Sequence, residues 1–117
     1  MSQPENDRRI DYIEFPVPDV GVARQFYSAA FGWTFTDYGP DYTSFEDGRL
    51  SGGFRGGEPA RPGGPLVVLY ATNLETAQAA VVAAGGKMTQ PPFEFPGGRR
   101  FHFLDPSGHE LAVWSDR

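Results

Sequence analysis

Few side chains in this sequence of 117 residues have the chemistry that catalysis usually needs. There is no cysteine, which excludes disulfides, thiol nucleophiles and zinc–thiolate sites. The two histidines are His102 and His109. An imidazole titrates near neutral pH, so His102 has the chemistry of a general base. A solvated or hydrogen-bonded imidazole is the simpler interpretation of both, and His109, which follows a turn glycine, is expected at the surface.

Serine and glycine motifs give no sign of a nucleophile or a phosphate site. Ser107 lies in Asp105-Pro106-Ser107-Gly108, a tight turn with proline at its second position. No base or oxyanion site that would activate this serine is apparent. Gly56-Gly57 and Gly63-Gly64 are not followed by a helix that carries a basic residue, as a phosphate loop requires.

The charge and the apolar runs limit the partners of the chain. The net charge is -5 and the basic residues are scattered, which argues against nucleic acid as a partner. No apolar run approaches the ~20 residues of a membrane span, and the polar N-terminus lacks the apolar core of a signal peptide. We therefore expect a cytoplasmic protein with neither a nucleic-acid nor a membrane partner.

The first half of the sequence predicts a strand, a capped helix and three further extended segments. In the strand Ile10–Val17, alternate residues face opposite sides. Asp19 is suited to cap a helix that ends at Gly32. The apolar stripe of that helix contains Val22, Ala23, Phe26, Tyr27 and Ala30, and extended segments follow from Trp33, at Tyr42–Phe45 and at Arg49–Arg55.

The same order returns after the glycine- and proline-rich linker 56–64. The second half predicts a strand at Leu66–Ala71, a helix capped by Thr72 or Asn73 with Leu74, Ala77, Val81 and Ala84 as its stripe, an extended Lys87–Thr89, a long loop at Pro91–Gly98, and strands at Arg100–Leu104 and His109–Trp114.

The two halves are related by a constant shift in numbering. Asn73 follows Asp19 by 54 residues, and Gly86 follows Gly32 by the same 54. We infer one α+β domain over residues 1–117, built from two tandem βαβββ modules: module 1 at about 9–55, the linker 56–64 and module 2 at about 65–115. Each module alone leaves a sheet face bare, so the two must pack together.

Several short motifs in this order resemble one known family. They are I-E-F-P-V-P-D-V (13–20), Gln25-Phe26-Tyr27, Phe31-Gly32-Trp33, Gly85-Gly86 and F-L-D-P-S-G-H-E-L (103–111). Together they resemble the vicinal oxygen chelate superfamily of glyoxalases, bleomycin-resistance proteins and extradiol dioxygenases. The resemblance implies two βαβββ modules whose curled mixed sheets surround a central pocket, and a homodimer.

The same resemblance identifies where a metal would be bound. Metal-using members take one ligand from the first strand of each module and one from the last, and these are His, Glu or Gln. Carried onto this chain, the positions are Tyr12, Leu66, Ala112 and Gly53, or Gly52 if the hairpin is one residue tighter. None of these residues is a good metal ligand, so we expect a pocket without a metal or other cofactor.

Strand alternation extends these positions into a set of pocket walls. The predicted ligand-binding residues are Tyr12, Glu14, Gly53, Leu66, Val68, Tyr70, Glu110, Ala112 and Trp114. Tyr12, Tyr70 and Trp114 are either stacking surfaces for a planar ligand or plain core residues.

Two of these residues, Glu14 and Glu110, are the candidate catalytic groups. Two glutamates in one partly apolar cavity would raise each other's pKa, and one would then act as acid or base. The alternative is that each is half exposed, or is ion-paired with Arg24, Arg99 or Arg100.

The sequence therefore predicts a metal-free protein of the glyoxalase and bleomycin-resistance type that binds a small apolar or aromatic molecule between its modules. One alternative is a lyase or isomerase that uses Glu14 or Glu110, and another is a metal-dependent glyoxalase-like enzyme with relocated ligands. A third is a structural or regulatory dimer whose pocket is vestigial.

Overall fold

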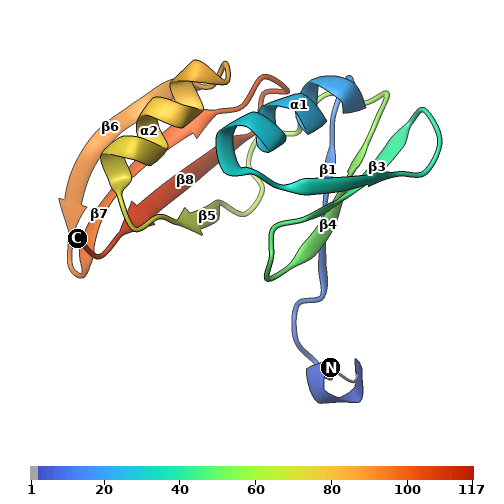
Figure 1. The fold of residues 1–117 in the computed structure, drawn as a ribbon, viewed down its shortest axis with the longest axis horizontal. Helices are drawn as coiled ribbons and strands as arrows, with labels where there is room; N and C mark the ends of the chain where they lie inside the picture. The colour runs from blue at the N-terminus through green and yellow to red at the C-terminus, as the bar shows by residue number, and fades with distance from the viewer. Residues whose placement is uncertain (1–2) are drawn as a thin grey trace.

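The computed structural model describes residues 3–117 and consists of two similar halves (Figure 1). A short 3-10 helix at Gln3–Asn6 precedes them. The first half contains β1 (Tyr12–Pro16), α1 (Val20–Phe31), β2 (Thr34–Asp37), β3 (Tyr42–Glu46) and β4 (Ser51–Arg55). The second half contains β5 (Val67–Tyr70), α2 (Leu74–Ala83), β6 (Lys87–Phe95), β7 (Gly98–Leu104) and β8 (Glu110–Ser115).

Each half forms its own four-stranded mixed sheet with the same strand order. The orders are β1-β4-β3-β2 and β5-β8-β7-β6, and in each sheet the first strand of the half pairs in parallel with the last. The prediction of two tandem βαβββ modules is thus confirmed. The two sheets do not close on one another. Both helices lie above the sheets in Figure 1, so each sheet keeps one face away from the helices.

Both helices begin at the predicted capping positions. The Asp19 carboxylate accepts hydrogen bonds from the amides of Gly21 and Val22, at 2.8 and 3.2 Å. In α2 the cap is Asn73, whose side chain accepts from the amide of Thr76 at 2.9 Å, which decides between the two candidates there. Gly32 ends α1 with a φ of 72°, the left-handed conformation that glycine adopts without steric cost.

The core lies between the helices and the upper faces of the sheets and is rich in aromatic rings. Tyr27 of α1 stacks on Trp33 and Phe54, with ring centroids 4.6 and 5.3 Å apart. The buried stripe of α1 begins at Val20, and not at Val22 as predicted, because Val20 is buried and Val22 is 42% exposed. The fully buried large side chains come from both halves and include Phe26, Phe54, Leu74, Val81, Phe101, Phe103, Leu111 and Val113.

The predicted loop at Pro91–Gly98 is wrong. Most of it belongs to β6, which extends to Phe95 before the tight turn into β7. Pro91 and Pro92 fall where the pairing of β6 with β7 shifts register, between Gln90 and Phe93. Because β6 is the outer strand of its sheet, a proline there removes few ladder hydrogen bonds.

Side chains of β5 alternate between the core and the open face of the sheet. Val67 and Leu69 pack against the core, whereas Val68 and Tyr70 are 41% and 47% exposed on the other face. Neither helix of the described chain has the length and apolar character needed to cross a membrane.

Candidate functional site

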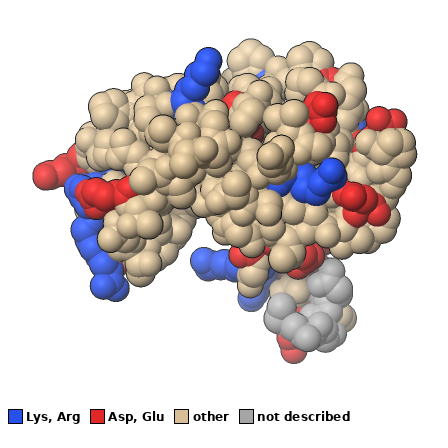
Figure 2. Space-filling model, turned by 45° about the horizontal axis from the view of Figure 1, so that its top comes forward, with Lys and Arg blue, Asp and Glu red and all other residues tan. Residues whose placement is uncertain are grey.

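A cavity of about 1110 Å³ lies between the two halves. Its walls come from β1, from the last residue of β4, from residues 61–66 and the start of β5, and from parts of β6, β7 and β8. Figure 2 shows the surface hollowed between the halves on the lower side of that view, where charged side chains of both signs gather. The cavity is large enough for a small organic ligand.

The structure brings four of the predicted ligand-binding residues into this cavity and leaves five outside its walls. Tyr12, Glu14, Leu66 and Glu110 line it. Of the others, Gly53 lies in β4 and Ala112 in β8, while Val68, Tyr70 and Trp114 lie farther along the second sheet. There Tyr70 and Trp114 contact each other edge to face, with ring centroids 5.2 Å apart.

The first half carries a pair of tyrosines beside β4. The hydroxyl oxygens of Tyr12 and Tyr42 are 2.6 Å apart. A side chain at Gly53 would meet Tyr42 Oη directly, and its Cβ would lie 2.6 Å from Tyr12 Oη. Gly53 pairs with Glu14 as Ala112 pairs with Val68, so it occupies the position equivalent to Ala112. Its missing side chain is what makes room for the two phenols.

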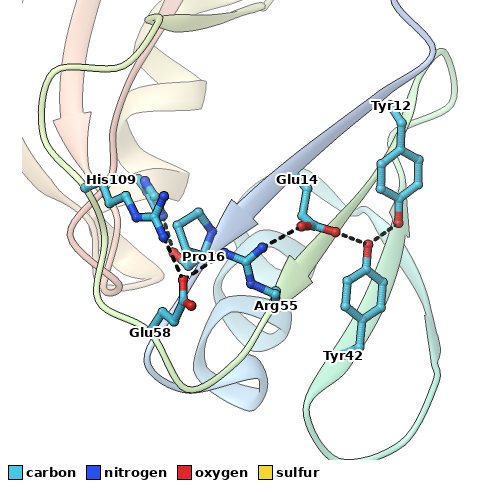
Figure 3. A network of polar contacts seen from close by, with 8 residues as sticks. Tyr12, Glu14, Pro16, Tyr42, Arg55, Glu58 and His109 are labelled. Carbon is cyan, nitrogen blue, oxygen red and sulfur yellow. Dashed lines mark hydrogen bonds and ion pairs between the residues drawn. The ribbon is translucent and has the colours of Figure 1, made fainter.

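Glu14 lies at the centre of a polar chain that extends from this tyrosine pair (Figure 3). Tyr42 donates to Glu14 Oε1 at 2.9 Å, and Arg55 Nη1 donates to Glu14 Oε2 at 2.9 Å. Arg55 also donates through Nη2 to Glu58 at 2.7 Å, and Arg61 donates to the same oxygen at 3.1 Å. Both oxygens of Glu14 are therefore occupied by donors from its own half.

The ion pairs of this chain shift the pKa values of its members. The hydrogen bond and charge of Arg55 lower the pKa of Glu58, and Arg61 lowers it further. The same contact with Glu58, followed by the charge of Glu14, raises the pKa of Arg55. For Tyr42, partial burial raises the pKa far above its ordinary value, and the hydrogen bonds with Tyr12 and Glu14 add to the effect. The tyrosine thus keeps its proton at neutral pH.

Glu110 has a different environment in the second half. His102 Nδ1 and Thr89 Oγ1 each lie 3.2 Å from Glu110 Oε2. His102 Nε2 is buried and has no hydrogen-bond partner among the described residues, which favours the tautomer whose proton is on Nδ1 and donates to Glu110. Within residues 3–117, Glu110 Oε1 accepts no hydrogen bond, so one oxygen of this carboxylate remains available.

The predicted partners of the two glutamates are wrong. Arg24 pairs with Asp37 at 2.9 Å and Arg99 with Glu75 at 2.6 Å. Arg100 lies over the ring of Phe93, 5.4 Å from its centroid. The partner that replaces them in the first half is Arg55.

His109 is half-buried and not at the surface as predicted. Its Nε2 lies 2.6 Å from the carbonyl oxygen of Pro16, to which it donates. Its ring also contacts Phe15 edge to face, with centroids 5.1 Å apart. This histidine links the start of β8 to β1, and the expectation of a hydrogen-bonded imidazole is confirmed.

Sequence reasoning missed Tyr42 and Arg55. The sequence predicts extended segments for both, but it does not show which of these segments pair. Once β3 is set antiparallel to β4, Tyr42 pairs with Arg55, and the alternation of β1 brings Glu14 to the same side. The sequence does contain a signal for this cluster: charged and aromatic residues occur at alternate positions of the strands that prove to be adjacent.

The residues at the four family positions do not fit a divalent metal ion. Gly53, Leu66 and Ala112 have no donor atom in the side chain, and the Tyr12 hydroxyl is engaged with Tyr42. Across residues 3–117, no three His, Asp or Glu side chains come close enough together to hold a metal ion.

Comparison with known proteins agrees with the fold. Residues 9–113 match the family model of the Glyoxalase/Bleomycin resistance protein/Dioxygenase superfamily. The chain therefore belongs to this superfamily.

Particular relatives refine the comparison. The chain is 36% identical to the anthracycline biosynthesis protein DauV of Streptomyces sp. (strain C5) and 34% identical to DnrV of Streptomyces peucetius, over 118 residues in each case. These alignments cover 83% of this chain but 43% of each relative, so the chain spans less than half their length. A glyoxalase/bleomycin resistance protein/dioxygenase family enzyme from Burkholderia phytofirmans PsJN has the same fold, with a TM-score of 0.81, 16% identity, and coverage of 92% of this chain and 100% of that one.

Proposed function

We propose that this protein binds a small aromatic organic molecule, without a metal ion, in the cavity between its halves. The observation that carries the proposal is the replacement of metal ligands by a hydrogen-bonded tyrosine pair and apolar side chains, beside a cavity of about 1110 Å³. A site with apolar walls and a few fixed polar groups is typical of organic ligands. The names of the two Streptomyces relatives suggest an anthracycline, a planar polycyclic aromatic compound, as the first probe.

We further propose that the protein functions as a homodimer. Tyr12, Leu66, Val68 and Tyr70 are between 38% and 47% exposed. Exposed apolar side chains at alternate positions of one strand, as at Leu66, Val68 and Tyr70, favour a surface that a partner covers. A second copy facing these residues would also enclose the cavity. Light scattering after size exclusion tests the dimer, and a monomer at high protein concentration contradicts it.

The binding experiment is a thermal-shift titration with doxorubicin, in the presence and absence of EDTA. A ligand that binds only the folded protein raises the melting temperature as its concentration exceeds Kd. We expect the same shift with and without EDTA, and no stoichiometric metal in the purified protein by elemental analysis. A shift that EDTA abolishes would contradict the metal-free proposal.

A matched pair of variants tests the location of the ligand. Leu66→Glu introduces a charge into the cavity wall, whereas Val82→Glu introduces the same charge on an exposed part of α2, outside the cavity. We expect Leu66→Glu to weaken binding at least about tenfold, since burying a charge against an aromatic ligand is unfavourable. Equal affinities of the two variants would move the site elsewhere.

A lyase or isomerase that uses Glu110 is the second candidate function. It is favoured by the unoccupied Oε1 of Glu110, whose other oxygen is held by His102 and Thr89. Solvent deuterium exchange into enolisable ketones tests this activity. Glu110→Gln should abolish the exchange, and Glu14→Gln, whose wild-type carboxylate has both oxygens occupied, should retain it.

A further inference from the structure

The polar chain of the first half has a definite donor direction, because each phenol has only one proton. Both phenols lead to the carboxylate of Glu14, which is ion-paired with Arg55 and is an acceptor only. Arg55 donates to one of its oxygens at 2.9 Å and Tyr42 Oη lies 2.9 Å from the other.

The single proton of Tyr42 must therefore be directed at Glu14. The opposite orientation would place lone pairs of the phenol against a carboxylate oxygen at 2.9 Å, which is repulsive. Charge-assisted hydrogen bonds of this kind are stronger than neutral ones, so the carboxylate fixes the orientation. The raised pKa of Tyr42 means that this proton is retained well into the alkaline range.

The proton of Tyr12 is fixed in turn. Since Tyr42 has no second proton, the 2.6 Å contact between the two hydroxyls requires Tyr12 to donate. The other acceptor within reach is Ser44 Oγ at 3.4 Å, a longer and weaker contact, and the Ser44 proton is itself used at the carbonyl of Gly52 at 3.0 Å. The Tyr12 oxygen is left with lone pairs and no free proton.

Tyr12 is also the member of the pair that a ligand can reach. It is 42% exposed and lines the cavity, whereas Tyr42 is half-buried and is not among the residues of the cavity walls. The series of donors therefore begins at the cavity wall, where the Tyr12 oxygen can only accept a hydrogen bond.

We propose that Tyr12 selects ligands that carry a hydroxyl group, by accepting a hydrogen bond from it at the end of the chain to Glu14. The proposal rests on the proposed binding function and specifies its ligand. A ligand hydroxyl extends a series of hydrogen bonds that all donate toward one negative charge, and such series strengthen one another. A ketone or ether oxygen in the same place would face another acceptor and leave both groups unsatisfied.

Three naphthalene probes of nearly equal size test the preference: 2-naphthol, 2-methoxynaphthalene and 2-acetylnaphthalene. We expect the wild-type protein to bind the naphthol about tenfold more tightly than the ether or the ketone, the effect of one hydrogen bond in a partly enclosed site. Isothermal titration calorimetry or ligand fluorescence gives the three dissociation constants.

Variants then assign the preference to the tyrosine pair. Tyr12→Phe removes the acceptor, so the naphthol and the ether should bind equally. Tyr42→Phe leaves Tyr12 with a free proton, so the ketone should gain relative to the ether. Tyr38→Phe, at a 66% exposed tyrosine outside the cavity walls, should keep the wild-type preference.

The outcomes separate the inference from the function on which it rests. If the wild-type protein binds all three probes equally, or if Tyr12→Phe keeps the full preference, the acceptor role of Tyr12 is overturned and the binding function stands. If neither the naphthalenes nor doxorubicin bind the wild-type protein, both proposals are overturned. Equal binding of the three probes to the wild type overturns the inference even where a variant folds poorly.

Discussion

The two halves of the molecule have the same strand pairing and opposite chemistry. β1 and β5 pair in parallel with β4 and β8 in the same register, so that Gly53 corresponds to Ala112 and Glu14 to Val68. The first half carries a polar chain at these positions and the second carries small and apolar side chains. The comparison teaches that backbone pairing and the helix-facing positions constrain a duplicated unit, while the open face of each sheet is free to diverge.

One helix-facing position also differs between the halves. Gly52 corresponds to Leu111, because they pair with Ile13 and Val67 in the same way. A Cβ at Gly52 would meet the Phe45 ring and the carbonyl oxygen of Ile13. The aromatic ring of a neighbouring strand therefore fills, in the first half, the volume that a leucine fills in the second.

The largest expected effect on stability comes from giving Gly52 a side chain, as its equivalent in the second half has. Gly52→Ala should reduce the free energy of unfolding by about 3 kcal/mol, because neither a packed ring nor a backbone carbonyl can move away cheaply. Thermal and urea unfolding measure the change. Ala112→Gly, a change of the opposite kind at the residue of β8 next to Leu111, is the control and should cost about 1 kcal/mol. Similar losses in the two variants would contradict the comparison.

The next effect comes from a hydrogen bond between the halves that has no symmetric counterpart. Tyr27 of α1 donates to Asp105 Oδ2 at 2.7 Å, and both side chains are buried. The position equivalent to Tyr27 in α2, 54 residues later, is Val81, so the reverse contact cannot form. Tyr27→Phe should cost about 2 kcal/mol, the value for a hydrogen bond to a charged group. Chemical unfolding is the measurement.

The equivalent turn of the first half supplies the control for this bond. Asp47 accepts from the amides of Arg49 and Leu50, as Asp105 does from those of Ser107 and His109, but no tyrosine among residues 3–117 donates to it. Asp47→Asn keeps an acceptor and should change stability by less than about 0.5 kcal/mol. A loss as large as that of Tyr27→Phe would show that the turn, and not the link between halves, carries the energy.

The helix caps should differ by a smaller amount. Asp19 accepts two backbone hydrogen bonds and Asn73 accepts one. We expect Asp19→Ala to cost about 1.5 kcal/mol and Asn73→Ala about 0.5 kcal/mol, measured by thermal unfolding. Asp19→Asn, which preserves the capping oxygen, is the control and should stay close to the wild type. A reversed order would mean that helix stability does not follow the count of capping bonds.

The smallest effect is an alkaline pH dependence that belongs to Tyr27. Burial, with the charge and hydrogen bond of Asp105, raises the pKa of Tyr27 well above 10. A group whose pKa is raised by folding stabilises the folded state below its unfolded pKa, and this contribution is lost as the pH rises through the folded pKa. The difference in melting temperature between the wild type and Tyr27→Phe should therefore narrow above pH 10.

A matched variant at another tyrosine tests whether this effect belongs to Tyr27. Tyr38→Phe, at a 66% exposed position, should run parallel to the wild type from pH 8 to 11. A gap between wild type and Tyr27→Phe that stays constant over this range would contradict a raised pKa.

The fold was predictable because its signals are local and repeated. The cap at Asp19, the two candidates Thr72 and Asn73, and the stop at Gly32 follow from side-chain chemistry within a few positions, and the structure uses Asp19, Asn73 and Gly32. The error at Pro91–Gly98 has a physical origin, because proline disfavours a strand only where its amide would be paired. Whether a strand lies at the edge of a sheet is a property of the whole fold.

The candidate site was predictable only in part for the same reason. Strand alternation located Glu14 and Glu110, because each depends on its own strand. It did not give their partners, Arg55 and His102, because those depend on which strands are neighbours and in which register. The burial of His109 likewise arises from a contact with Pro16, from the other half of the chain.

The two consecutive prolines of β6 have a consequence for how the protein behaves at high concentration. Pro91 and Pro92 interrupt β6, the edge strand of the second sheet, where unpaired backbone amides could otherwise pair with a strand of another molecule. A polypeptide that approaches this edge finds no continuous ladder to extend, and growth into fibres is blocked there. The residues that obscured the strand in the sequence thus protect the molecule from polymerising along it.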